Sequence, residues 1–219
     1  MSTFPGAPRL VKGGIVLLNP NSLAVLRVIS FQYNPETLTR TLEIMGTGAD
    51  GGDRSETLRL KGAPAETIKV DVEIDATDQL EFPGQSPDAV NFGILPQLDV
   101  LETIVYPASR TVQQNNNLAN VGTLEISPVE SPLALFVWSA KRVLPVRLTE
   151  FSITEEFFNA ALNPIRAKVS LGMRVLNTND LQFSHKASNL FMVHHQQKEQ
   201  RASKSKTGLL LNLGISRIK

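Results

Sequence analysis

The 219-residue sequence contains no cysteine. This absence excludes a disulfide framework, a thiolate metal site and a thiol nucleophile, and it leaves the redox compartment open. Large aromatic residues are also scarce, with one tryptophan and two tyrosines. A peptidoglycan-binding or peptidoglycan-cleaving factor would need a groove lined by such side chains, so the composition argues against that class.

Long apolar runs are missing as well. The longest run, residues 133–138, is far shorter than the roughly 20 residues that a membrane-spanning helix needs. The first residues have neither the basic start nor the apolar core of a signal peptide. We therefore expect a soluble protein that is made in the cytoplasm and does not insert into a membrane.

Charge is unevenly distributed, although the net charge is only +1. Residues 186–219 carry seven basic residues against Glu199 alone, a net charge of +6, which leaves −5 on residues 1–185. A basic segment can bind nucleic acid, an anionic membrane or an acidic face of a like subunit. With Phe191 as its single aromatic residue, nucleic acid is not the expected partner. We divide the chain into a domain of residues 1–185 and a basic extension of residues 186–219.

Alternating apolar residues predict a mainly β fold in the first half of the chain. Residues 14–18 and 23–33 predict a first hairpin, whose second strand is apolar on both faces at its start and is therefore expected to be covered on both sides. Residues 38–44 predict a half-exposed strand. Residues 46–56, rich in glycine and acid, lack the ending of a phosphate-binding loop and predict a mobile hairpin tip.

Two Asn-Pro pairs interrupt the strand pattern. Pro35 has no amide hydrogen to donate and biases Asn34 toward an extended conformation, so strand pairing should stop there. Asn163 and Pro164 precede a later strand in the same way. The two corners set strand ends either at an interface between subunits or only within one subunit, and both alternatives stay open.

Three acidic residues, Asp71, Glu73 and Asp75, share one face of the strand predicted for residues 67–75. Same-face neighbours on a strand lie about 6.5 to 7 Å apart, within the range of glycosidase carboxylate pairs. A catalytic pair must converge on a bond from two sides, whereas these side chains project in parallel. We expect a solvated or partner-facing stripe, not a catalytic site.

One helix is predicted at residues 94–105, where apolar residues keep a helical spacing, and residues 110–120 predict a polar loop. Residues 133–176 predict a meander of buried strands. Its last strand carries Arg166, Lys168 and Arg174 on the face opposite its apolar residues. Cross-strand pairing of these cations with Glu155 or Glu156 is the simplest role for them.

Motifs for catalysis and metal binding are lacking. His194 and His195 are adjacent and so diverge, and His185 is remote from both. The sequence has no nucleophile elbow or zinc-protease motif. We expect no enzyme activity, no cofactor and no metal.

Two segments resemble the tube-initiator family of contractile injection systems, which are phage-tail-like particles related to phage baseplates. They are "RVISFQYNPETLTRTLE" at residues 27–43 and "LFVWSAKRVLPVRLTEFSITEEFFNAALNPIRAKVSLGMRVL" at residues 135–176. The resemblance implies a tail-tube fold of two packed antiparallel sheets with a helix, which forms a β-barrel ring on oligomerisation. It also implies a homo-hexamer that joins a trimeric spike to the inner tube protein within the baseplate and initiates the tube.

The resemblance leaves two further points. Many relatives continue into a LysM-like module, and we expect none here because residues 186–219 lack its pattern. We expect this extension to act as an assembly clasp, ordered mainly in the particle, with Leu209 and Leu211 among its apolar anchors. A tube-terminating cap of the same particle is the alternative, since both share the tube fold.

Overall fold

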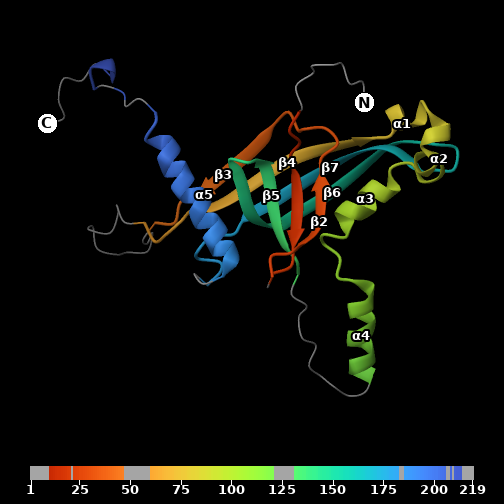
Figure 1. Cartoon of the computed structure of the whole chain (residues 1–219), viewed down its shortest axis with the longest axis horizontal. Coiled ribbons are helices and arrows are strands. Elements are labelled where there is room, and N and C mark those ends of the chain that lie inside the picture. Colours follow the sequence, from red (N-terminus) through yellow and green to blue (C-terminus); the bar gives the residue numbers. More distant parts are fainter. Residues whose placement is uncertain are drawn as a thin grey trace.

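Seven strands among the described residues form one antiparallel sheet in the order β2-β1-β5-β6-β7-β4-β3 (Figure 1). The structure is a computed structural model that describes residues 10–20, 22–46, 60–120, 131–182, 185–205, 208 and 210–213. The strands are β1 Gly14–Leu18, β2 Val25–Ser30, β3 Leu38–Glu43, β4 Ala65–Asp75, β5 Leu133–Ser139, β6 Arg142–Phe158 and β7 Pro164–Val175. The mainly β fold, the first hairpin and the β5-β6-β7 meander are confirmed.

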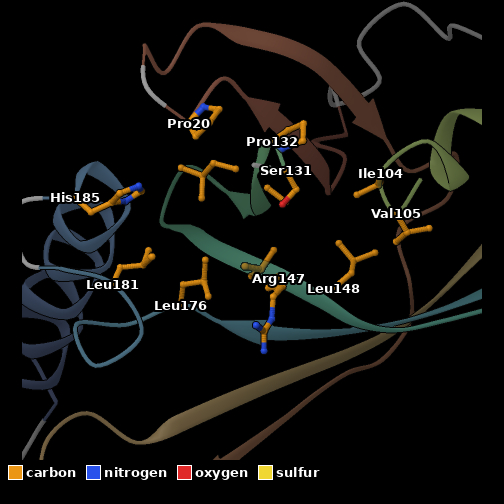
Figure 2. Close-up of a pocket in the computed structure, with 13 residues that line it drawn as sticks. Pro20, Ile104, Val105, Ser131, Pro132, Arg147, Leu148, Leu176, Leu181 and His185 are labelled. Carbon is orange, nitrogen blue, oxygen red and sulfur yellow. The ribbon is translucent and has the colours of Figure 1, made fainter. Parts of the chain in front are cut away.

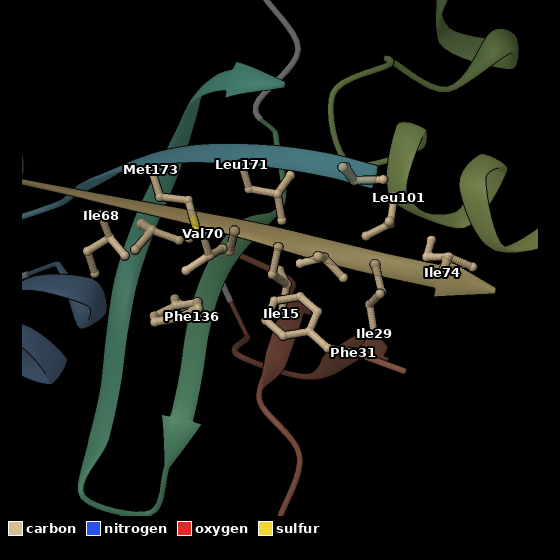
Figure 3. Close-up of a cluster of buried hydrophobic side chains, with 14 of the residues drawn as sticks. Ile15, Ile29, Phe31, Ile68, Val70, Ile74, Leu101, Phe136, Leu171 and Met173 are labelled. Carbon is tan, nitrogen blue, oxygen red and sulfur yellow. The ribbon is translucent and has the colours of Figure 1, made fainter. Parts of the chain in front are cut away.

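The sheet folds back on itself and encloses one core. Phe31, which follows β2, and Phe136 on β5 face Val70 on β4 and Met173 on β7 across this core (Figure 3). The two layers expected from the sequence are therefore two halves of a single sheet. The reason is the length of β6, which pairs with β5 through its first residues and with β7 through the rest. In the single chain the sheet is not closed, because β2 and β3 remain at its edges.

The prediction that the strand of residues 23–33 is covered on both faces is wrong. The strand β2 pairs only with β1, and Val25 and Val28 are 62% and 65% exposed. Leu26 between them is exposed too, and Ile29 is the one residue of β2 that is buried. An edge strand has a neighbour on one side only, so its apolar pattern does not guarantee cover.

Helices close the two open ends of the folded sheet. The described helical segments are α1 Thr77–Leu80, η2 Pro83–Gln85, α2 Pro87–Phe92, α3 Leu95–Glu102, α4 Ser109–Asn120, α5 Lys186–Ala202 and η3 Leu210–Leu213. The predicted helix is α3, whose Leu98 and Leu101 are buried in the core. The expectation of a single helix is wrong, because the described residues form other helices besides α3.

The polar loop predicted for residues 110–120 is wrong, because this segment forms α4. The helix has no buried residue and extends away from the sheet (Figure 1). A search for core-facing periodicity could not find it, since it has no core face. The hairpin tip predicted for residues 46–56 lies outside the described residues except for Gly46, which forms a β-bridge with Leu60.

Candidate functional site

The acidic stripe and the basic face of the sequence lie on adjacent strands. In the register of β4 and β7, Glu73 lies opposite Lys168 and Asp75 lies opposite Arg166, while Asp71 lies opposite Ser170. All of these residues belong to the outer face of the sheet, since the alternate residues of both strands are buried. The acidic stripe of β4 and the basic residues of β7 therefore form one polar face. We call this face the outer ladder, and it comprises Asp71, Glu73, Asp75, Arg166, Lys168 and Ser170.

Ion pairs hold the outer ladder together. The Arg166 guanidinium lies with Nη2 3.2 Å from Glu73 Oε2 and with Nε 3.9 Å from carboxylate oxygens of both Asp75 and Glu156. Lys168 Nζ lies 3.7 Å from Glu156 Oε1. These contacts include the predicted pairing with Glu156, and they show that the acids also pair with the cations of β7. Two cations thus lie among four carboxylates, so the ion pairs offset part of the negative charge and the stretch stays net acidic.

Catalysis finds no support in this geometry. The hydroxyl of Ser170 donates a hydrogen bond of 2.6 Å to Asp71 Oδ1, and the neighbouring acids point toward cations of β7. The acids run along one strand and do not converge on a common point. Among the described residues no group of three or more His, Cys, Asp or Glu side chains is arranged to hold a metal ion.

The Asn34-Pro35 corner lies beside the outer ladder. Both residues line a groove of ≈ 670 Å³ together with Asp71, Glu73 and Lys168. The structure thus brings five of the predicted site residues to one place. Arg174 stands apart, at the other end of β7, where its Nη2 lies 2.8 Å from Asp180 Oδ1.

The corner itself has a role within the subunit. Asn34 Oδ1 accepts a hydrogen bond from the amide of Gly13 (2.9 Å), and its Nδ2 donates to the carbonyl of Val11 (2.8 Å). The side chain thereby satisfies backbone groups of the segment that enters β1, where no strand pairs. Asn34 thus makes contacts inside the subunit, as the internal alternative predicts.

The second corner fixes helices to the sheet. Asn163 Nδ2 donates to the carbonyl of Asn91 at the end of α2 (2.8 Å), and the carbonyl of Pro164 accepts from the amide of Ile94 (2.9 Å). Gly93, with φ +60, passes against Pro164 where no side chain would fit. This corner therefore positions the α2–α3 junction against the start of β7.

The first part of the basic extension packs on its own subunit. Ala187, Phe191 and His194 of α5 are buried against the sheet, although the sequence predicts a segment that becomes ordered mainly in a particle. Leu209 lies outside the described residues, and Leu211 lies in η3 with its side chain undescribed.

A buried polar cluster beneath α5 was not predicted. Glu66 on β4 accepts a hydrogen bond of 2.6 Å from Arg40 Nε on β3, and Lys198 Nζ of α5 lies 3.9 Å from its other oxygen. His194, 6% exposed, lies in the same region, and its Nδ1 is buried without a hydrogen-bond partner among the described residues. Burial lowers the pKa of His194 to about 4, and the nearby cations Lys198, Arg201 and Arg40 act in the same direction.

A cavity of ≈ 420 Å³ opens near the other side of α5 (Figure 2). Its walls are mainly apolar, with Leu148, Leu176 and Leu181 among them, and they also include Arg147 and His185. No described residue of this cavity forms a catalytic pair with another. None of the described helices has the length and apolar character needed to cross a bilayer.

Comparisons with known proteins give little. No family model matches the sequence, and no curated protein matches it. A solved structure of the tail of an empty GTA particle, which has C6 symmetry, is similar with a TM-score of 0.30 and 10% sequence identity over 75% of this chain and 90% of that chain. A similarity at this level carries no weight for fold or function. The function of this chain must therefore be inferred from its own geometry.

Proposed function

We propose that the chain is a structural subunit of a phage-tail-like contractile particle. In this proposal six copies form a ring that joins a trimeric spike to the inner tube and initiates tube polymerisation. Its other partners are the inner tube protein and the remaining baseplate components. The role is one of assembly, without catalysis, cofactor or metal.

The observation that carries the proposal is an open sheet with two unpaired edges, both of which expose apolar side chains. At one edge β2 exposes Val25, Leu26 and Val28, and at the other edge β3 exposes Leu42. Folded monomers normally blunt such edges with charge, proline or a covering element, because a bare edge pairs with other chains. Unlike edges on one subunit favour head-to-tail contacts, which close into a ring when the rotation between subunits closes.

The outer ladder supports the same proposal. Its side chains are polar, and the ion pairs of Arg166 and Lys168 already offset part of its negative charge. Such a surface needs no partner to satisfy it and can face water. In a ring closed through the edges, we assign this face to the lumen.

The alternative of a peptidoglycan-binding factor gains nothing from the structure. Trp138 stacks on Phe136 with ring centroids 6.0 Å apart, and it is therefore engaged in the subunit's own packing. A tube-terminating cap shares the proposed architecture, and only its position in the particle separates it from an adaptor.

The test uses purified particles and an edge variant. Val25→Lys with Leu26→Lys places two charges on the edge of β2, and we expect a folded subunit that is absent from particles. Val112→Lys, at an exposed site of α4, is the matched control and should be incorporated. Electron microscopy of particles containing the wild-type chain should show a sixfold ring at the spike end. A threefold or single copy would contradict the ring, and a position at the distal end would identify a cap.

A further inference from the structure

The hairpin between β6 and β7 ends in an exposed apolar tip. Residues 157–163 read Phe-Phe-Asn-Ala-Ala-Leu-Asn and carry no charge. Phe157 is 68% exposed and Leu162 is 79% exposed. We call residues 157–163 the hairpin tip. Large apolar side chains gathered at one exposed point are typical of a contact site.

The backbone of the hairpin tip is strained at two residues. Phe157 has φ +53 and Leu162 has φ +62, a region that bulky residues rarely adopt. Asn159 fixes the loop, since its Oδ1 accepts hydrogen bonds from the amides of Ala161 and Asn163, each 2.9 Å. Strain retained at exposed apolar residues indicates a function for the tip.

A groove of ≈ 360 Å³ lies at the open seam of the sheet, between β2, the end of β4 and α3. Val28, Val72, Ile74 and Val100 are among the apolar residues that line it, and Gln97 stands in its wall. The Gln97 Oε1 atom is buried and has no hydrogen-bond partner among the described residues. We call this the seam groove.

Hydrogen bonds fix both ends of the seam groove. Arg27 Nη1 donates to Thr103 Oγ1 (3.0 Å), which ties β2 to the residues after α3. Gln32 Nε2 donates to the carbonyl of Asp75 (2.7 Å), and the amide of Asp75 donates back to Gln32 Oε1 (3.0 Å). The groove is therefore preformed in the isolated subunit.

We propose that the hairpin tip of one copy inserts Phe157 and Leu162 into the seam groove of a second copy. The absence of charge on both surfaces selects this groove. Of the four cavities described in this chain, the other three include charged side chains, whereas no charged residue lines the seam groove. An uncharged tip thus meets an uncharged groove.

This inference rests on the proposed assembly role, because it names the contact that joins neighbouring subunits. Tip and groove are different surfaces of one chain, so the contact can be made head-to-tail and repeat around a ring. Insertion also covers the exposed Val28 at the edge of β2, where the folded sheet fails to close.

Engineered cysteines test the contact directly, since the chain has none of its own. Purified Leu162→Cys protein is mixed at high concentration with Val28→Cys protein under mild oxidation. We expect a disulfide-linked heterodimer that forms at least tenfold faster than with Val112→Cys protein, whose thiol lies at an exposed site of α4. Equal rates for the two mixtures would overturn the proposal.

A second variant avoids the problem of misfolding. Phe157→Asn with Leu162→Asn places at both positions a residue that tolerates positive φ. Its melting temperature should therefore equal or exceed that of the wild type, while self-association at high concentration should weaken at least tenfold. A variant that melts lower, or one that associates as the wild type does, would overturn the proposal.

Particles separate this inference from the proposed function. Cross-linking of purified protein without incorporation into particles would leave the contact standing and defeat the particle role. Incorporation into a sixfold ring without a Leu162–Val28 cross-link would defeat the contact alone. A cross-link from Leu162→Cys to a different particle protein would assign the tip to that partner and also overturn the contact.

Discussion

His194 should make the stability of the subunit depend on pH. The residue lies beneath α5, with Lys198 and Arg201 on its own helix and with Arg40 on β3 and Glu66 on β4 as the facing charged groups. Its pKa is about 4 in the folded chain against an ordinary value of 6.5. Between these two values the unfolded chain holds a proton on this imidazole that the folded chain does not hold. The free energy of unfolding must therefore fall as the pH falls from 6.5 toward 4.

The size of this effect follows from the two pKa values. Proton linkage gives a loss of about 2 kcal/mol from this residue between pH 7.5 and pH 5. Such a loss is a large part of the roughly 5 to 15 kcal/mol that stabilises a typical domain. The sign is opposite to that of a histidine stabilised by a carboxylate, because burial and the nearby cations outweigh Glu66 here.

Urea unfolding at pH 7.5 and at pH 5 measures the effect. The wild type should lose about 2 kcal/mol more than His194→Gln over this interval, whatever the variant's own stability at pH 7.5. His195→Gln is the matched control, since His195 is exposed beside Glu199, and its loss should equal that of the wild type. If His194→Gln and the wild type lose the same free energy, His194 is not buried in its neutral form and the packing of α5 described above is wrong.

Two further predictions concern stability. Changing Asp71, Glu73 and Asp75 together to Asn should leave the circular dichroism spectrum unchanged. It should lower the free energy of unfolding by less than about 2 kcal/mol, because exposed ion pairs contribute little. Loss of the fold in this variant would refute the prediction. Gly93→Ala should lower the free energy of unfolding in urea by about 1 to 3 kcal/mol, because φ at this position is +60 and the new methyl group would collide with the carbonyl of Pro164. Gly84→Ala is the control, since its methyl group would enter open space and should change the stability little. Equal stability of the two variants would contradict the strain argument.

Periodicity predicted the parts of the fold in which every other residue meets the core. The face of β4 that carries Ile68, Val70 and Val72 is buried, as its alternation indicates, and the acidic stripe on the other face is exposed or half-buried. The cations of β7 were also placed on the outer face. Pairing with Glu156 was predicted, but pairing with Glu73 and Asp75 was not, because strand order is set by the whole chain and only the folded sheet brings β4 beside β7.

Elements whose burial depends on a distant neighbour were not predictable. The helix α4 has no core face, so no pattern marked it. The docking of α5 depends on its fit against β6 and on the contact of Lys198 with Glu66 on β4, which is far away in the chain. The Asn34 corner was located correctly, but its hydrogen bonds to Val11 and Gly13 follow from tertiary contacts that the sequence does not display.

The wrong prediction for β2 is itself informative. A run that is apolar on both faces predicts cover on both sides, and the isolated subunit leaves Val25, Leu26 and Val28 bare. Sequence and structure agree in most strands, so a local disagreement of this kind is expected where a chain serves something other than its own stability. Local pattern and final burial would agree again if a second chain covered the strand. The edge of β2 is therefore the place where the proposed ring, and the hairpin tip of a neighbour, should be sought first.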